Sequence, residues 1–300
     1  MRTLLLAATA AALLPGTPAT AATPVTQAMT CPIGGKAFNF ATSPAYTTWG
    51  ERPDGKPYGS LEFPTPLPEC PDNGLVLYKD YEPEEVAKLE PLVAGEAYQA
   101  LRGDVPYYRA YWLMKEMGVP AEASLLALQR AAWQADKQPE RRARYLAEFA
   151  EETAKLPAKP SDLNWIGMEG RAINALRELG RFDEALARLG KLPASALDAP
   201  EGTAGAEGKA ANAVRIRAGW ASYFKQMRAV IDRKDASAEP FELLPRRIWT
   251  ERCIAGKGLS ESQQAHCTAQ ATVVEEARAA RAQAEAEAKA LSQSRDKSGR

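Results

Sequence analysis

The residues best suited to chemistry in this 300-residue chain are its four cysteines, two of which open the same short pattern. Cys31-Pro32-Ile33-Gly34-Gly35 and Cys70-Pro71-Asp72-Asn73-Gly74 both have the form C-P-x-x-G. A thiolate on such a turn can ligate zinc, but two thiolates alone cannot complete a four-coordinate structural site. We therefore predict a Cys31–Cys70 disulfide and no metal or other cofactor. A metal site completed by carboxylates or water is the alternative.

Cys253 and Cys267 make the second pair. Four cysteines allow three pairings, and proximity in the sequence favours a Cys253–Cys267 disulfide. The competing interpretation is a free nucleophilic thiol with His266, the only histidine, as its base. Adjacent residues of a helix point about 100° apart, which makes His266 and Cys267 poor partners. The sequence has no G-x-S-x-G, H-E-x-x-H or C-x-x-C motif either.

The first residues of the chain are typical of an export signal. Arg2 precedes the apolar run Leu4–Leu14, and Ala19-Thr20-Ala21 offers the small residues of a cleavage site. We predict a signal peptide over residues 1–22, with a buried N-terminal helix as the alternative. Export implies a periplasmic or secreted protein in an oxidising compartment, where disulfides persist.

Overall charge argues against nucleic-acid binding, and hydropathy argues against a membrane-spanning segment. The 38 basic side chains equal the 38 acidic ones, so phosphate neutralisation offers no basis for nucleic-acid binding. No segment after the signal approaches the 18 apolar residues of a membrane span, so no integral membrane segment is predicted.

Residues 23–80 read as a small β-ribbon. Turn sequences at Gly34-Gly35, Pro53-Asp54-Gly55 and Asp72-Asn73-Gly74 alternate with short apolar pairs. The pattern predicts strands at Ala37–Phe40, Ser60–Phe63 and Leu75–Tyr78. A ribbon of this size has little core, so it needs a covalent link.

The two knuckles and the helices after them resemble an uncharacterised bacterial family. Its members carry a zinc-ribbon-like segment with two C-P-x-C-G knuckles, followed by a tetratricopeptide-like helical domain. The residues that carry the resemblance are Cys31, Pro32, Gly35, Phe38, Cys70, Pro71 and Gly74. Gly34 and Asn73 stand where the family has its other two cysteines, so the ribbon here is degenerate.

Apolar spacing near 3.6 residues begins at residue 82 and predicts a helical domain over residues 81–192. Within it, helices are predicted from residue 82 and at 105–117, 121–135, 139–156, 161–179 and 181–192. Leu179-Gly180-Arg181-Phe182-Asp183-Glu184-Ala185 is similar to the turn of a tetratricopeptide repeat, although an ordinary helical bundle would explain it as well. A linker (193–206), a helical C-terminal part (207–274) and a polar helical or disordered tail (275–300) follow. A coiled-coil partner for this tail is the alternative, but its sequence has no a/d heptads.

An aromatic group in the helix predicted at 105–117 is the one binding candidate. Tyr108, Tyr111 and Trp112 lie near one face at helical spacing, so they could line a peptide groove or belong to the core. The basic residues Arg141, Arg142 and Arg144 are interpreted as a solvated face.

Together these observations predict a mainly α fold with a disulfide-stapled β-ribbon before a tetratricopeptide-like domain. Stacked helix pairs form extended surfaces that hold peptides or partner proteins. The function predicted is therefore a non-enzymatic interaction or scaffold module of the cell envelope. An envelope hydrolase or redox enzyme whose site is assembled from scattered residues is the alternative.

The composition of the tail generates a first prediction. Deletion of the residues after 278 should change the thermal unfolding midpoint by no more than a degree or two, because the segment has no apolar stripe with which to pack. Circular dichroism melting of the full and shortened chains measures the midpoint. A loss of many degrees would show that the tail is docked along its length.

Overall fold

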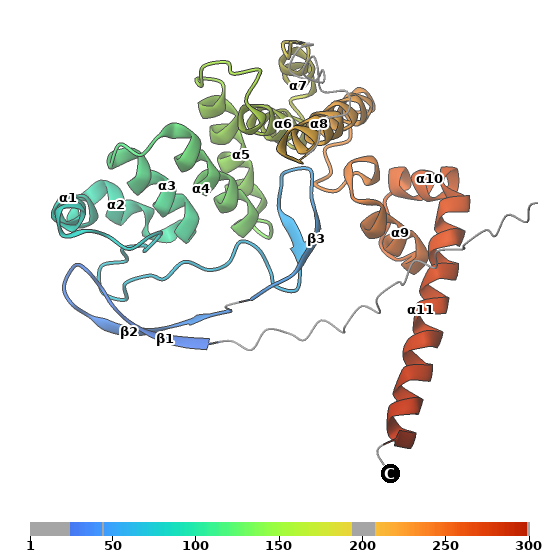
Figure 1. Ribbon diagram of the computed structural model, residues 1–300. Helices are drawn as coiled ribbons and strands as arrows, with labels where there is room; N and C mark the ends of the chain where they lie inside the picture. Colours follow the sequence, from blue (N-terminus) through green and yellow to red (C-terminus); the bar gives the residue numbers. More distant parts are fainter. Residues whose placement is uncertain (1–24, 44, 194–207, 299–300) are drawn as a thin grey trace, which may run out of the picture.

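The computed structural model describes residues 25–43, 45–193 and 208–298, with side chains up to residue 293. The predicted signal peptide and, apart from Pro193, the predicted linker lie outside these residues. The fold is mainly α-helical, with two small hairpins at the N-terminal end. Figure 1 shows the helices following one another along a curved stack, the N-terminal segment running beneath it, and a C-terminal group at one end.

Two antiparallel hairpins supply the strands. β1 (Val25–Thr30) pairs with β2 (Ala37–Thr42), with Thr30 opposite Ala37 next to the turn. β3 (Thr48–Glu51) pairs with β4 (Pro57–Gly59) around the Pro53-Asp54-Gly55 turn. Gly55 has a φ of 82°, a conformation that side chains with a Cβ rarely adopt.

Two of the three predicted strands are wrong. Ser60–Phe63 precedes Pro64 and Pro66, which lack the N–H that a strand ladder needs. Leu75–Tyr78 makes only an isolated bridge, between Glu69 and Val76. The N–H of Val76 instead faces the Tyr98 hydroxyl at 3.3 Å, and its carbonyl accepts a hydrogen bond from Tyr81. This segment makes two main-chain hydrogen bonds to residues 68–70, and its remaining contacts are to side chains from elsewhere in the fold, so no strand forms.

The helices match the predicted periodicity closely, and Pro83 begins the first one as predicted. The described helices are α1 (Pro83–Ala94), α2 (Glu96–Ala100), α3 (Pro106–Glu116), α4 (Ala121–Gln134), α5 (Pro139–Thr153), α6 (Leu163–Glu178), α7 (Phe182–Leu189), α8 (Gly208–Asp232), α9 (Arg246–Ala255), α10 (Glu261–Ala269) and α11 (Ala271–Ser298). Each helix from α3 to α7 packs mainly on the next, and α8 packs on both α6 and α7. No helix in the described part of the chain combines the length and apolar character needed to cross a bilayer.

A continuous core runs through the stack from α3 to α8. Leu128, Tyr145, Ile173 and Met227 are fully buried in it, and Ala185 lets α7 approach α6 closely. Burial of large apolar side chains of this kind stabilises the fold by about 1.5–3 kcal/mol per residue.

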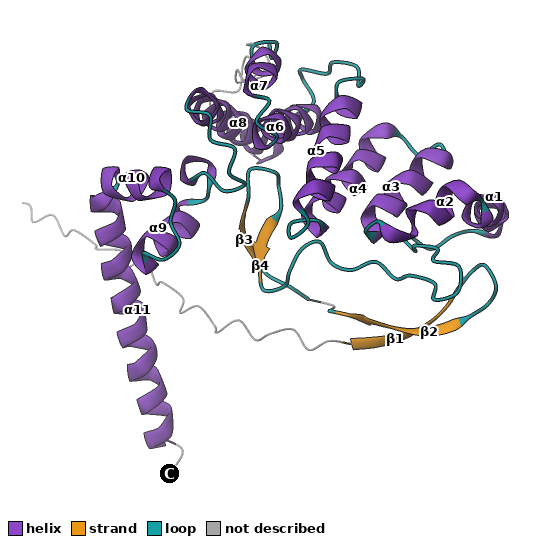
Figure 2. Ribbon diagram, turned by 180° about the vertical axis from the view of Figure 1, so that it is seen from behind, coloured by secondary structure: helices purple, strands orange, loops and turns teal. Residues whose placement is uncertain are grey.

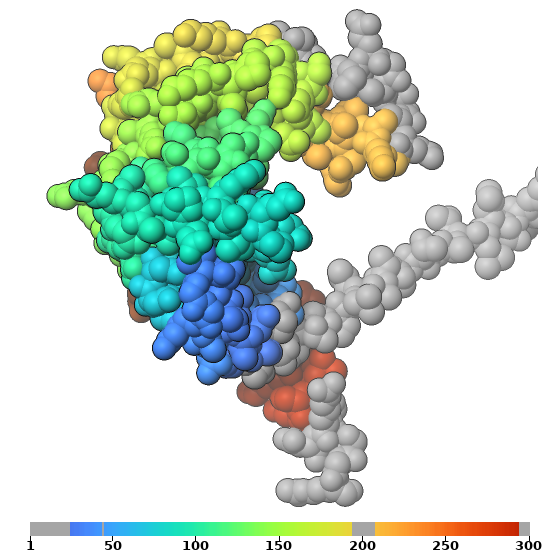
Figure 3. All heavy atoms as spheres, turned by 90° about the vertical axis from the view of Figure 1, so that its left-hand side faces the viewer, coloured from blue at the N-terminus to red at the C-terminus, as the bar shows by residue number. Residues whose placement is uncertain are grey.

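The N-terminal segment does not form a core of its own. Cys31, Cys70 and Leu75 are buried together with Leu89 of α1 and Leu113 of α3. Figure 3 shows the hairpin β1–β2, in blue, lying directly against the surface of the first helices, in cyan. The ribbon is therefore packed onto one end of the helical stack.

The β3–β4 turn is fastened to the helices by six charged side chains, here called the hairpin charge cluster. Its members are Arg52, Asp54, Lys56, Asp136, Arg142 and Glu178. Arg142 contacts Asp136 at 3.0 Å, Asp54 at 3.3 Å and Glu178 at 2.5 Å. Arg52 and Lys56 both reach Asp136 at 2.8 Å. Three positive and three negative groups balance, which reduces the cost of removing them from water.

Arg142 corrects one interpretation of the sequence. It is 8% exposed and does not belong to a solvated face. It stands three, four and seven positions before Tyr145, Leu146 and Phe149 and so shares their buried face. Burial raises the pKa of the Asp54 carboxyl, but Arg52 and Arg142 outweigh it and hold that pKa below its usual range.

The C-terminal helices form a smaller unit around Phe241, Leu244 and Trp249. The polar tail is a helix as predicted, and α11 projects away from the body (Figure 1). The start of α11 is attached: Val274 is buried, and exposed ion pairs join Arg246 to Glu276 and Glu251 to Arg281. Exposed pairs contribute at most about 1 kcal/mol each, so the distal part of α11 adds little stability.

Replacement of Arg142 by Met should lower the free energy of unfolding by about 3–5 kcal/mol, because Asp54 and Glu178 would stay buried without their partner. Urea denaturation measures this loss. Arg141→Met is the matched control. The Arg141 side chain is 34% exposed, and Asp104, which it contacts at 3.6 Å, keeps its ion pair with Arg144, so we expect a change within about 0.5 kcal/mol. Equal stability of both variants would mean that the hairpin charge cluster does not hold the turn.

Candidate functional site

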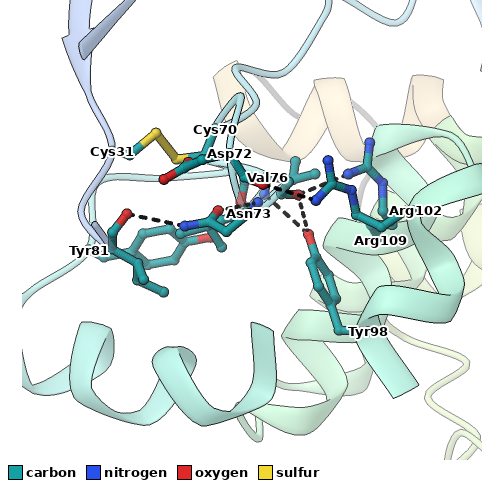
Figure 4. Close-up of a disulfide and its surroundings, with 12 residues drawn as sticks. Cys31, Cys70, Asp72, Asn73, Val76, Tyr81, Tyr98, Arg102 and Arg109 are labelled. Carbon is teal, nitrogen blue, oxygen red and sulfur yellow. Dashed lines mark hydrogen bonds between the residues drawn. A yellow bond between two sulfur atoms is a disulfide. The ribbon is translucent and has the colours of Figure 1, made fainter. Parts of the chain in front are cut away.

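The predicted Cys31–Cys70 disulfide is present, with its α-carbons 5.6 Å apart. The two turns that carry it are equivalent. The N–H of Cys31 donates to the carbonyl of Lys36, five residues on, and the N–H of Cys70 donates in the same way to Leu75. The two knuckles thus face each other, as Figure 4 shows. The pairing follows from this geometry.

Gly34 and Asn73 occupy the positions where a full zinc ribbon has its other two cysteines. The Asn73 amide donates a hydrogen bond of 3.1 Å to the Ile33 carbonyl of the opposite knuckle. Its side-chain oxygen accepts from the N–H of Leu75 at 2.9 Å. Asn73 therefore links the two turns by hydrogen bonds where a thiolate would link them through a metal.

One group of side chains at this place has the chemistry of metal ligands. The Cys31 and Cys70 sulfurs and a carboxylate oxygen of Asp72 lie within 4.8 Å of one another. Three donors are one short of the four that structural zinc sites use, and both sulfurs are committed to the disulfide. The arrangement found is a covalent clasp.

Tyr98 and Arg109 support the clasp from α2 and α3 (Figure 4). Both donate to the carbonyl of Gly74, at 2.8 Å and 2.9 Å. Arg109 also forms a two-pronged ion pair with Glu69, at 2.6 Å and 2.8 Å. The second knuckle is thus held by helix side chains as well as by the disulfide.

The second predicted disulfide, Cys253–Cys267, is also present and joins α9 to α10. All four cysteines are therefore oxidised. The alternative of a Cys267 nucleophile with His266 as its base is wrong. His266 instead has its Nδ1 atom 3.3 Å from a Glu242 oxygen, and its ring lies edge-on to Trp249.

The aromatic candidates do not share one surface. Tyr111 is 2% exposed and belongs to the core, which agrees with the core alternative. Tyr108 is half-buried, stacks on Tyr145 at 4.6 Å and donates to Glu148. Burial and the Glu148 carboxylate raise its pKa to about 12. Trp112 lies elsewhere, against Tyr98 beside the clasp.

The helices also bind the chain's own extended segment, residues 52–76, here called the strap. Tyr223 of α8 donates to the Pro53 carbonyl at 3.0 Å, and Gln129 of α4 donates to the Asp54 carbonyl. Tyr107 of α3 donates to the Thr65 carbonyl at 3.0 Å. Side chains from α3, α4 and α8 thus hold the main chain of the strap.

A groove on another part of the stack has no such occupant among the described residues. It has a volume of about 610 Å³ and lies between the end of α5, the loop 154–162, α6 and α7. The apolar residues that line it are Ala150, Ala154, Leu156, Ala158, Pro160, Trp165, Leu176, Ala187, Leu192 and Pro193. We call it the α5–α7 groove.

Charged side chains surround this apolar lining. Arg188 pairs with Glu169 at 2.8 Å and also donates to the Ala150 carbonyl at 2.7 Å, so it ties α5, α6 and α7 together. Arg181 pairs with Glu184 at 2.6 Å. The described lining residues include no cysteine, histidine, serine or threonine; the ionisable ones are glutamates, arginines and Lys191.

Sequence reasoning identified the repeat-like turn beside this groove but not the groove itself. Gly180 makes the turn with a φ of 71°, and Phe182 packs on the core as the motif suggests. Trp165, Ala187 and Arg188 have no distinctive spacing. Only the approach of α7 to the α5–α6 loop brings them together.

No family model, curated protein or solved structure matches this chain.

Removal of the two disulfides should destabilise different parts of the chain and by different amounts. We expect Cys31→Ala with Cys70→Ala to lower the free energy of unfolding by about 4 kcal/mol, because the bond closes a long loop with a sequence separation of 39. Hydrogen exchange should rise over residues 31–78 while α4–α8 stay protected. Cys253→Ala with Cys267→Ala, separation 14, should cost about 3 kcal/mol and leave residues 31–78 unchanged. Loss of all helicity in the first variant would contradict this.

Proposed function

We propose that the protein is a non-enzymatic interaction module of the cell envelope that binds an extended segment of a partner protein in the α5–α7 groove. The observation that carries the proposal is the composition of this groove. Apolar side chains from three helices line it, charged groups border it, and its described residues include no thiol, hydroxyl or imidazole. Its volume of about 610 Å³ is that of an ordinary ligand site.

Two further observations support a peptide as the occupant. The stack already holds one extended segment, the strap, by hydrogen bonds from helix side chains to its main chain. That side of the helices is taken, which leaves the α5–α7 groove as the open surface for a second segment. Exposed Glu151, Ala154 and Ala187 at its edge make it accessible from solvent.

Periplasmic or secreted localisation is part of the proposal. Two disulfides that pair all four cysteines fit an oxidising compartment, where such bonds persist. The export signal over residues 1–22 remains a prediction from the sequence. Oxidation of every thiol also weighs against an envelope enzyme with a cysteine nucleophile.

We also propose that the first eighty residues derive from a metal-binding ribbon and that the helices are tetratricopeptide-like. The matching hydrogen bonds of the two knuckles support the first statement, since each cysteine N–H bonds the carbonyl five residues on. The tight approach of α7 to α6 at Ala185, next to the Gly180 turn, supports the second.

Selection of random peptides displayed on phage, with the oxidised protein as target, tests the proposed binding. Enriched sequences should share apolar residues flanked by charges, because they must match the groove lining and its rim. A synthetic enriched peptide should bind the Ala187→Glu variant at least about tenfold more weakly, since this exposed residue lies inside the groove.

The matched control is Ala87→Glu, an equally exposed alanine on α1, which should bind the peptide as the wild type does. Thermal melting checks that both variants are folded. Equal affinity for all three proteins, or failure to enrich any sequence, would contradict the proposal.

A further inference from the structure

Residues of the β3–β4 turn, α6 and α8 line a second cavity. Figure 2 shows the tip of the β3–β4 hairpin next to these two helices. The volume of the cavity is about 310 Å³. The lining residues are Glu51, Arg52, Pro53, Gly55, Arg171, Ile216, Gly219, Trp220, Tyr223 and Leu243. Four segments far apart in the sequence (residues 51–55, 171, 216–223 and 243) thus contribute to one small site, which is separate from the α5–α7 groove.

Arg171 is the unusual member of this lining. No carboxylate, side-chain oxygen or carbonyl among the described residues accepts a hydrogen bond from its guanidinium, and its Nε atom is buried without a partner. Three more deeply buried arginines have acceptors for their Nη groups: Arg109 and Arg142 pair with carboxylates, and Arg177 donates to the carbonyls of Asp235 and Ser237. The Nε atom of Arg109 also lacks a partner, but its Nη groups do not. A buried donor without an acceptor costs about 1–3 kcal/mol, more where the group is charged.

Two glycines create the space that the guanidinium occupies. A Cβ on Gly55 would lie 2.7 Å from the Arg171 Nε atom, and a Cβ on Gly167 would lie 3.3 Å from one of its Nη atoms. Such approaches are tighter than side chains normally allow, so the guanidinium is seated between the hairpin turn and α6. The shape of the site holds the guanidinium in place. Glu51, whose carboxylate it attracts, makes no hydrogen bond or close ion pair with it.

The surroundings of Arg171 favour an apolar molecule with a single negative charge. Trp220, Ile216 and Leu243 supply apolar surface in the same cavity. The indole of Trp220 lies across α6, where a Cβ on Gly170 would come within 2.7 Å of its ring. Glu51 also lines the cavity, and its carboxylate disfavours a second negative charge. Arg52 is already paired with Asp54 and Asp136, which leaves Arg171 as the available cation.

We infer that this cavity binds a small monocarboxylate with an apolar or aromatic body. The carboxylate forms a two-pronged pair with the Arg171 guanidinium, whose planar N–H groups match it geometrically. The apolar body packs on Trp220 and Ile216. Because the lining comes from the β3–β4 turn, α6 and α8, the bound acid also strengthens the attachment of the strap to the helices.

Isothermal titration and thermal-shift measurements on the full oxidised protein test this inference, with phenylacetate as the probe. The wild type should bind phenylacetate saturably and melt at a higher temperature in its presence. Arg171→Gln should bind at least about tenfold more weakly, because a charge-assisted hydrogen bond is lost. Phenylacetamide, which has the same shape but no charge, should show a similar loss on the wild type.

Two controls separate binding from folding. Arg228→Gln, on the exposed surface of α8, should bind phenylacetate as the wild type does. Without ligand, Arg171→Gln should melt at or above the wild-type temperature, because no hydrogen bond is removed. Should the variant melt much lower, Arg171 has a structural role and the inference fails.

Inorganic phosphate in place of phenylacetate tests the charge argument. It should bind more weakly than phenylacetate, since Glu51 opposes a dianion and the apolar surface stays uncovered. Stronger binding of phosphate, or no binding of phenylacetate to the wild type, overturns the assignment.

Discussion

The structure depends on one constraint: an extended segment whose only regular ladder is the short β3–β4 pairing is buried against helices, and its other main-chain polar groups need partners. The strap meets this requirement through side chains of the stack. Tyr98 and Arg109 donate hydrogen bonds to the Gly74 carbonyl. Tyr107 donates to the Thr65 carbonyl, and Tyr223 donates to the Pro53 carbonyl. Each donor lies on a helix well separated in sequence from its acceptor. The need for these hydrogen bonds explains the positions of the four donors on α2, α3 and α8.

The two ends of the strap are fixed by different interactions, a disulfide at one end and ion pairs at the other. At one end the Cys31–Cys70 bond and the Asn73 hydrogen bond join two facing turns over a shared apolar core. At the other end the hairpin charge cluster neutralises three cations with three carboxylates. The covalent bond constrains the unfolded chain, whereas the charge cluster is costly to break because each partner would remain buried alone. Together they explain why the described residues between 25 and 80 follow the helices and do not form a separate domain.

Occupation of one side of the stack by the strap determines where further ligands can bind. The α5–α7 groove has paired charges around an apolar lining, which suits a chain segment that brings its own apolar side chains. The cavity beside the hairpin turn has an unpaired cation, which suits a molecule that brings a negative charge. The contrast between Arg188, which donates to Glu169 and Ala150, and Arg171, which donates no hydrogen bond in the described chain, separates the two sites.

Local features of the sequence determined the helices, the turns and both disulfides. Period 3.6 placed α3 to α8 within a few residues of their ends, Gly180 and Gly55 marked positive φ, and the repeated C-P-x-x-G pattern paired Cys31 with Cys70. Tertiary structure alone decided the course of the strap, the burial of Arg142 and the isolation of Arg171. The physical reason is that periodicity and turn chemistry act over a few residues, whereas these features depend on partners such as Asp54 and Arg142, 88 positions apart. The sequence around a charged residue beside an apolar helix face is the same whether water or a distant carboxylate compensates the charge.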